Sequence, residues 1–120
     1  HAMKKTLAAL AIATCIPTAA ALADDAAEWS SMIGEAVAIS AYCKINLSAP
    51  YNDAVMTVWV AGTDEMKTGF AEGKNRFVKR ITEHPAFFGS ESGKEMFCAD
   101  ALTWTDILTG DRIFVPQLGS

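Results

Sequence analysis

Residues 25–44, DAAEWSSMIGEAVAISAYCK, carry the pattern that decides the fold. Apolar and small side chains recur in this stretch at intervals of three and four residues, the spacing of one face of an α-helix. Asp24 or Asp25 can cap the start of such a helix, and Glu28 suits the positive end of its dipole. We expect a helix whose buried stripe consists of Trp29, Met32, Ile33, Ala36, Val37, Ser40 and Cys43.

A second segment, residues 54–61, combines two signals. Its valine content favours a strand, whereas an Asn-Asp pair before it and Gly62 after it are typical helix boundaries. A lone strand would lack a partner in a chain otherwise so helical, and we therefore expect a helix. Residues 46–50 should form a break before it, because Pro50 is disfavoured inside a helix.

The longest helical pattern covers residues 64–83 and follows Thr63, a suitable N-cap. Gly69 and Gly73 weaken such a helix by about 1 kcal/mol each relative to Ala. Their position on or beside the apolar stripe predicts the close approach of another helix. The helix should end just before Pro85, because the residue preceding a proline avoids helical backbone angles. The stripe consists of Met66, Phe70, Gly73, Phe77 and Ile81.

A last helix is predicted after a loop that holds Phe87 and Phe88. Ser92 and Glu95 have the spacing of a capping box at its start, and Gly110 is a suitable stop. We expect residues 111–118 to form an extended tail that packs back on the core. The apolar residues of this helix are Phe97, Cys98, Ala101, Leu102, Trp104, Ile107 and Leu108.

The N-terminal 23 residues have the three parts of a secretory signal peptide. Residues 3–5, Met-Lys-Lys, supply the positive start, residues 6–16 the apolar run, and residues 21–23, Ala-Leu-Ala, the cleavage site. The apolar run is shorter than the roughly 20 residues that span a bilayer. We therefore expect a periplasmic or secreted protein without a membrane span, whose working chain begins at Asp24.

Cys15 offers an alternative to plain secretion, because it follows a short apolar run as the lipid-bearing cysteine of a lipoprotein does. Thr14 is a poor residue before such a cleavage point, and Ile12 replaces the usual Leu. Lipid anchoring through Cys15, or a retained N-terminal anchor, is therefore the lesser alternative. His1 and Ala2, ahead of the methionine, have the look of residues left from cloning.

Removal of the signal leaves two of the three cysteines, Cys43 and Cys98. An even pair in an oxidising compartment predicts a disulfide. The sequence contains no Cys-x-x-Cys and no basic cluster around Cys98, so a redox or nucleophilic thiol is the weaker interpretation. We expect residues 24–120 to form a single domain, an all-α bundle of about four helices in which the disulfide joins the first helix to the last.

The exported chain is acidic. Two lysines leave with the signal, so eight Lys and Arg remain against fourteen Asp and Glu, and the net charge becomes −6 in place of −4. A chain of this charge should not bind nucleic acid or an anionic membrane surface through its overall field.

One basic cluster lies within this acidic chain. Arg76, Arg80 and His84 are spaced by four residues and therefore share one helical face. That face would suit an acidic partner or an anionic ligand. The more usual interpretation is an ordinary solvated helix surface, because Glu72 lies four residues before Arg76 and Glu83 four after Lys79, so partial pairing along the helix is available. The cluster consists of Lys74, Arg76, Lys79, Arg80 and His84.

Phe87 and Phe88 form the most suggestive apolar feature. Two adjacent aromatic rings do not easily face one core. Either both rings are buried by a loop folded over the bundle, which is the more usual arrangement, or one stays exposed as an anchor for a partner.

No catalytic, metal or cofactor motif is recognisable. His84 is the only histidine of the exported chain, so a multi-histidine zinc site is excluded. No serine or free thiol stands in a motif with it. Carboxylate pairs such as Asp100 and Asp106 lack the surroundings that a hydrolase needs. We predict neither an enzyme nor a cofactor.

The leading hypothesis is a non-enzymatic protein-binding module of inhibitor or immunity type, acting on another envelope or periplasmic protein, with self-association as an option. The layout is also similar to that of small helical periplasmic acid-stress chaperones with one disulfide. In acid, protonated carboxylates would make the net charge positive and loosen the bundle. A small enzyme and an apolar-ligand carrier are the remaining alternatives. The carrier's cavity would lie among Met32, Met56, Met66, Phe70 and Phe77.

Overall fold

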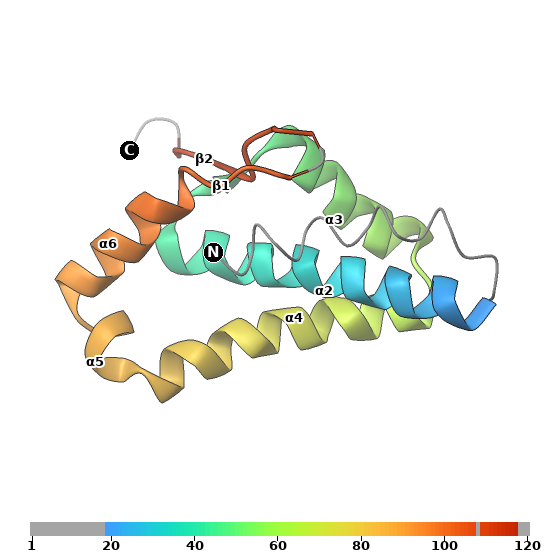
Figure 1. Cartoon of the computed structure of the whole chain (residues 1–120), viewed down its shortest axis with the longest axis horizontal. Helices are drawn as coiled ribbons and strands as arrows, with labels where there is room; N and C mark the ends of the chain where they lie inside the picture. Colours follow the sequence, from blue (N-terminus) through green and yellow to red (C-terminus); the bar gives the residue numbers. More distant parts are fainter. Residues whose placement is uncertain (1–18, 108, 118–120) are drawn as a thin grey trace.

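The structure, a computed structural model, describes residues 19–107 and 109–117. Within these residues the chain forms five helices and two short strands, and the predicted all-α bundle is confirmed (Figure 1). None of the helices in this part is both long and apolar enough to cross a bilayer. In chain order the elements are α2 (Ala19–Cys43), β1 (Asn46–Leu47), α3 (Ala49–Ala61), α4 (Asp64–Glu83), α5 (Pro85–Phe88), α6 (Glu91–Ala101) and β2 (Phe114–Val115).

The helices α2 and α4 form the largest interface and run side by side in the same direction (Figure 1). Gly69 lies against the carbonyl of Ala27 and Gly73 against that of Ser31, so the contact advances four residues along both helices. A Cβ on Gly73 would lie 1.8 Å from the Ser31 oxygen, and one on Gly69 2.3 Å from the Ala27 oxygen. Only glycine permits this separation, and the predicted close approach of a second helix is confirmed.

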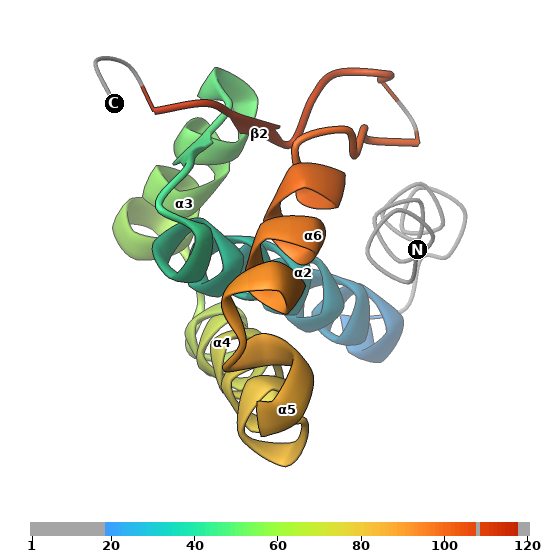
Figure 2. The ribbon, with the colours of Figure 1, turned by 90° about the vertical axis from the view of Figure 1, so that its left-hand side faces the viewer.

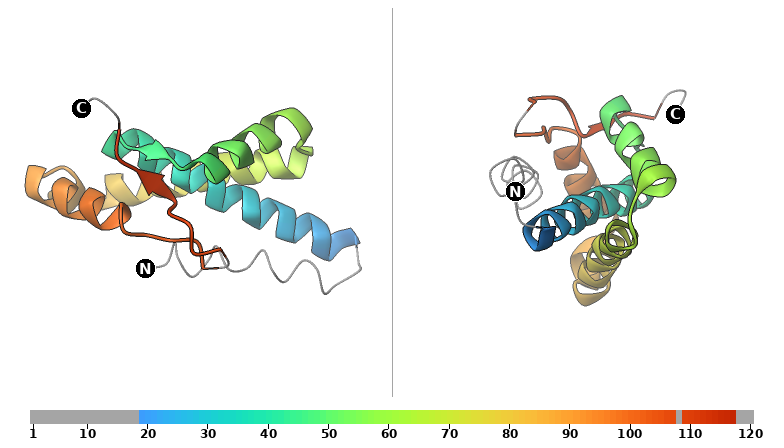
Figure 3. Two further views of the ribbon diagram at one scale, coloured as in Figure 1. Left: turned by 90° about the horizontal axis from the view of Figure 1, so that it is seen from above. Right: turned by 90° about the vertical axis from the view of Figure 1, so that its right-hand side faces the viewer.

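The helix α3 returns the chain from the end of α2 to the start of α4. Seen from the end, α2, α3 and α4 stand at the corners of a triangle (Figure 3). Val58 faces inward and is fully buried, while most of the outer surface of α3 stays exposed. The helix begins at Ala49, earlier than expected, because Pro50 lies in its first turn. The N–H that proline lacks would have no partner within the helix at that position, so its absence does not destabilise the helix.

Two predictions about the region between α4 and α6 are wrong. A short helix, α5, replaces the expected loop, because Pro85 is preorganised for a first helical position. The cap of α6 is Ser90, two residues before the expected Ser92. The Ser90 hydroxyl accepts a hydrogen bond from the amide of Gly93 at 3.0 Å.

The helix α6 ends at Ala101, well before the expected stop at Gly110. Its end tightens into three-residue turns, in which the amide of Trp104 donates to the Ala101 carbonyl at 3.1 Å. The Trp104 indole also donates to the Asp100 carboxylate at 2.9 Å. The Trp104 carbonyl accepts from the amide of Ile113 at 3.2 Å, so the chain turns back where it would otherwise continue as a helix.

The C-terminal tail returns to the bundle as predicted, and it does so as a strand. β2 pairs antiparallel with β1, with Asn46 opposite Val115 and Leu47 opposite Phe114. Figure 2 shows this segment crossing from α6 towards α3. Ile113 and Phe114 are almost fully buried. The tail therefore contributes to the core, although its strand partner could not be identified from the sequence.

One continuous core connects these elements. The disulfide between Cys43 and Cys98 joins α2 to α6, with Cα atoms 5.5 Å apart, and its prediction is confirmed. Residues 19–23 of the expected signal peptide continue into α2, whereas residues 1–18, with Cys15, lie outside the described residues. The largest fully buried side chains are Trp104, Phe77, Phe114, Met32, Ile33, Ile39, Ile113 and Val58.

Candidate functional site

A groove of about 540 Å³ opens where α4, α5 and α6 meet. Its walls are mostly apolar, with one cation from α4 and one carboxylate from α6. Three of its residues, Arg80, Phe87 and Phe88, belong to the set for which the sequence suggested partner binding. We call this site the aromatic groove, and its lining consists of Arg80, Phe87, Phe88, Met96, Phe97 and Asp100.

The sharp junction between α4 and α5 places the two phenylalanines at the groove. His84 leaves the helical region with φ −128° and ψ 59°, as expected for the residue before a proline. Its amide donates to the carbonyl of Arg80 at 3.2 Å, and its carbonyl accepts from the amide of Phe88 at 3.0 Å. His84 therefore ends one helix and begins the next, which is the helix-end position predicted for it.

The start of α6 is held closely against α5. The Ser90 hydroxyl, besides capping α6, donates to the carbonyl of Phe87 at 2.9 Å. A Cβ on Gly93 would lie 2.0 Å from the same carbonyl oxygen, so only a glycine allows α6 to approach this far. These contacts fix the relative position of the two helices whose side chains form the groove.

Stacked aromatic rings form the base of the groove. Phe88 lies edge-on to Phe97 with ring centroids 5.3 Å apart, and Phe97 stacks on Phe77 at 5.6 Å. Tyr42 of α2 contacts Phe77 edge-on at 5.7 Å. Such pairs stabilise by about 0.5–1.5 kcal/mol each beyond the area they bury. The base is therefore continuous with the core of the bundle.

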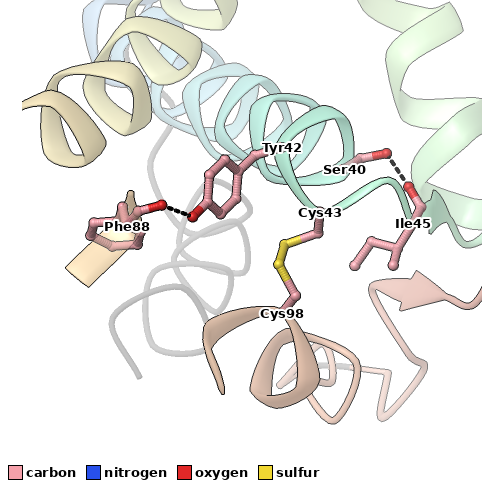
Figure 4. The surroundings of a disulfide bond; sticks show 6 residues. All are labelled: Ser40, Tyr42, Cys43, Ile45, Phe88 and Cys98. Atoms are coloured by element: carbon pink, nitrogen blue, oxygen red, sulfur yellow. Dashed lines mark hydrogen bonds between the residues drawn. A yellow bond between two sulfur atoms is a disulfide. The ribbon is translucent and has the colours of Figure 1, made fainter. Parts of the chain in front are cut away.

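The end of α2 holds both α5 and α6 (Figure 4). The Tyr42 hydroxyl donates to the carbonyl of Phe88 at 2.5 Å, and the next residue, Cys43, is bonded to Cys98 of α6. Burial raises the pKa of Tyr42 above its ordinary value. The Nζ of Lys94 lies 4.8 Å above the Tyr42 ring and adds a cation–π contact.

The two phenylalanines differ in exposure. Phe88 packs on the base, whereas Phe87 keeps 40% of its surface exposed. The more usual arrangement, with both rings buried, is therefore not the one that forms. Met96 on α6 is 67% exposed and lines the same groove. An exposed aromatic ring and an exposed, adaptable methionine are typical of surfaces that bind other proteins.

The basic cluster divides between two environments. Arg76 donates from Nε to Glu35 Oε1 at 3.4 Å, reaching across to α2 rather than pairing along its own helix. Arg80 lies 3.9 Å from the same oxygen and lines the groove. Lys79 and His84 are exposed and are not among the lining residues. Glu35 itself has only 7% of its side chain exposed.

Sequence reasoning missed Glu35, Met96 and Asp100. Glu35 was not recognised because it lies within the apolar stripe of α2. A lone carboxylate in such a stripe indicates a cation on the facing helix, and that signal could have identified it. Met96 and Asp100 are four residues apart and therefore share a face of α6. Because Phe97 was expected to be buried, the neighbouring face with Met96 and Asp100 could have been expected at the edge of the core, beside the groove.

A second exposed apolar surface lies on α3. Met56, Trp59 and Val60 have exposed fractions of 60%, 54% and 77%. Trp59 contacts Phe70 edge-on at 5.4 Å. Because Met56 faces solvent while Phe70 is buried, the residues named for the apolar-ligand alternative do not surround one enclosed space.

Neither a metal site nor a comparison with known proteins indicates a function for this chain. In residues 19–107 and 109–117, no group of three or more His, Cys, Asp and Glu side chains is placed to hold a metal ion. No family model, curated protein or solved structure matches the chain. The function is therefore argued from the aromatic groove itself.

Proposed function

We propose that this chain is an exported, non-enzymatic binding module of inhibitor or immunity type that engages another envelope or periplasmic protein through the aromatic groove. The observation that carries the proposal is the exposure of Phe87 and Met96 on a base made of core aromatic rings. Aromatic side chains in preformed pockets dominate the energy of protein interfaces.

The rigidity of the site supports the proposal. The Tyr42 hydroxyl holds α5 and the Cys43–Cys98 disulfide holds α6, so neither of these helices has to become ordered when a partner binds. Ordering interface side chains and loops costs about 0.5–1.5 kcal/mol for each immobilised side chain. A preorganised groove avoids much of this cost, which favours a binding role over a purely structural one.

The proposal is tested by photo-crosslinking in a native periplasmic extract. A photoreactive phenylalanine analogue at Phe87 should crosslink one defined protein, and the same analogue at Val60 on α3 should not. The double variant Phe87→Ser with Met96→Ser should lose capture of that protein. The matched control, Met56→Ser with Val60→Ser, removes as much exposed apolar surface elsewhere and should retain it. Capture that is equal for both double variants would exclude the groove as the binding site.

A specific observation favours acid-stress chaperone activity as a second candidate. The nearly buried Glu35 carboxylate lies between α2 and α4 and faces Arg76 and Arg80. Loss of the negative charge of Glu35 would leave the two cations without a counter-charge at the closely packed α2–α4 interface. The disulfide would limit the expansion that follows.

The chaperone candidate predicts apolar dye binding and a change of oligomeric state between pH 7 and pH 2.5. Glu35→Gln should bring part of this change to neutral pH, whereas Glu72→Gln on the exposed face of α4 should not. Unchanged dye binding and size down to pH 2.5 would eliminate this candidate.

A further inference from the structure

We infer that the aromatic groove selects an acidic–aromatic segment of its partner, in which an apolar side chain enters the groove and a neighbouring Asp or Glu binds Arg80. The inference rests on the function proposed above and specifies the chemistry of the partner. It follows from the state of Arg80, from the opposite wall of the groove and from the charges that continue along α4.

Arg80 has hydrogen-bonding capacity that the described residues do not use. Its guanidinium lies 3.9 Å from Glu35 Oε1, beyond hydrogen-bond distance, and 6.0 Å above the Phe77 ring. Arg76 occupies the same Glu35 oxygen with a 3.4 Å hydrogen bond and also donates to the Ser31 hydroxyl at 3.5 Å. Glu35 is therefore held mainly by Arg76, and Arg80 remains able to receive a second carboxylate through paired N–H donors.

The packing of Arg80 orients it for this role. Its side chain is 38% exposed, and its guanidinium lies over an aromatic ring at the edge of an apolar groove. A carboxylate bound there would be partly shielded from water, which strengthens the pair relative to a fully exposed one. An apolar side chain next to that carboxylate would cover Phe87 and Met96.

The opposite wall does not offer an equivalent site for a cation. Asp100 lines the groove on α6, but its Oδ2 already accepts the indole N–H of Trp104 at 2.9 Å. A cationic side chain entering the groove would also meet Arg80. A basic segment would therefore meet a cation on the α4 side, whereas an acidic segment can bind with its carboxylates at Arg80 and its apolar side chain between Arg80 and Asp100.

The charges beyond the groove favour an acidic segment over a single terminal carboxylate. Arg76 and Arg80 are four residues apart on α4, and Lys79 is exposed next to Arg80. A chain terminus supplies one carboxylate, whereas an acidic segment supplies several along this row. Because the exported chain has a net charge of −6, this face is also the place where an acidic partner meets the least repulsion.

The test uses three synthetic peptides titrated into the full chain and followed by amide chemical shifts. The probes are acetyl-Asp-Phe-Asp-Leu-Asp-amide and its counterparts with Asn or Lys in place of every Asp. The acidic peptide should shift the amides of Phe87, Phe88 and Met96 and bind about tenfold more tightly than the Asn peptide, with the difference decreasing at 0.5 M salt. The Lys peptide should bind more weakly than both.

Variants assign the selectivity to Arg80. Arg80→Met keeps the apolar stem and should reduce the preference for the acidic peptide to about twofold or less. Lys67→Met removes an exposed cation near the other end of α4 and should leave the preference unchanged. The comparison of peptides on the unmodified chain decides the question even if Arg80→Met fails to fold.

Failure of the inference is distinguishable from failure of the proposed function. Equal binding of the acidic and Asn peptides in the groove, or tighter binding of the Lys peptide, would overturn acidic selectivity while leaving the groove as a binding site. Absence of shifts at Phe87 and Met96 for all three peptides would also overturn it. The function itself would fall only if crosslinking at Phe87 also failed and the groove double variant captured the protein as well as its matched control did.

Discussion

The hydroxyl of Tyr42, in the last turn of α2, donates a 2.5 Å hydrogen bond to the carbonyl oxygen of Phe88, 46 residues further along the chain. The adjacent Cys43 is bonded to Cys98 (Figure 4). Two consecutive residues of one helix thus hold α5 and α6, two of the three helices that line the aromatic groove. A four-residue helix such as α5 is not stable by itself, so its position depends on such tertiary contacts.

Tyr42→Phe should release α5 without dismantling the fold. The variant keeps the ring contacts of Tyr42 and loses one hydrogen bond, with an expected cost of about 1 kcal/mol. Amide hydrogen exchange should become faster at Phe88 and Gly89, whose amides close α5, while α2 and α4 keep their protection. Tyr51→Phe is the matched control, because it removes a buried phenol that bonds Asp106 and does not line the groove. Unchanged exchange in α5 would show that the Tyr42 bond does not hold this helix.

Removal of the disulfide should have a larger effect. Cys43 and Cys98 are 55 residues apart, and the chain-entropy model assigns about 4 kcal/mol to a loop of that length. The variant Cys43→Ala with Cys98→Ala should therefore lower the unfolding midpoint by roughly 15–30 °C. Unfolding of the chemically reduced natural chain should give the same midpoint. A shift of only a few degrees would show that the ring contacts of Phe97 are enough to hold α6.

The parts of the fold that follow from local pattern were predictable. The three- and four-residue spacing predicted α2 and α4, and the pair of cysteines expected to remain after removal of a signal peptide predicted the disulfide. The end of α6 was not predictable, because it depends on Ile113, which meets Trp104 only after the tail has returned. The pairing of β1 with β2 is likewise non-local, and strands of two residues carry no periodic signal.

The site was predictable only in part for a related reason. Phe87, Phe88 and Arg80 were singled out from adjacency and charge, which are local properties. Their combination with Met96 requires the turn at His84 and the close approach of α5 and α6. The partner of Arg76 was mistaken because helix spacing favoured a glutamate on α4, whereas Glu35 on the facing helix lies at 3.4 Å. Tertiary packing overrode the local preference in that case.

The α2–α4 interface provides a prediction that opposes helix propensity. Gly73→Ala should favour an isolated helix by about 1 kcal/mol. In the bundle the added methyl would lie 1.8 Å from the Ser31 carbonyl oxygen, and the overpacking should cost about 1–3 kcal/mol. We expect a net loss of stability in urea unfolding. Asn75→Ala, on the exposed face of the same helix, should be neutral or slightly stabilising, and equal effects of the two variants would contradict the close packing.

Tyr51 gives the chain a defined sensitivity to high pH. Its buried hydroxyl donates to Asp106 Oδ2 at 3.0 Å. Burial and the negative charge of Asp106 raise the pKa of Tyr51 well above the ordinary 10.0. The unfolded chain therefore releases this proton first as the pH rises. The stability due to the protonated phenol is fully present below pH 10 and is lost progressively above it, by about 1.4 kcal/mol per pH unit.

Tyr51→Phe tests this dependence. The variant should be less stable than the natural chain at pH 7 by about 1 kcal/mol, because it loses the hydrogen bond to Asp106. Between pH 10 and 11.5 its urea unfolding midpoint should fall less steeply, so that the two chains converge. Some decline should persist, because the pKa of Tyr42 is also raised by burial. Parallel pH profiles would mean that Tyr51 titrates alike in the folded and unfolded chains, contrary to its burial against Asp106.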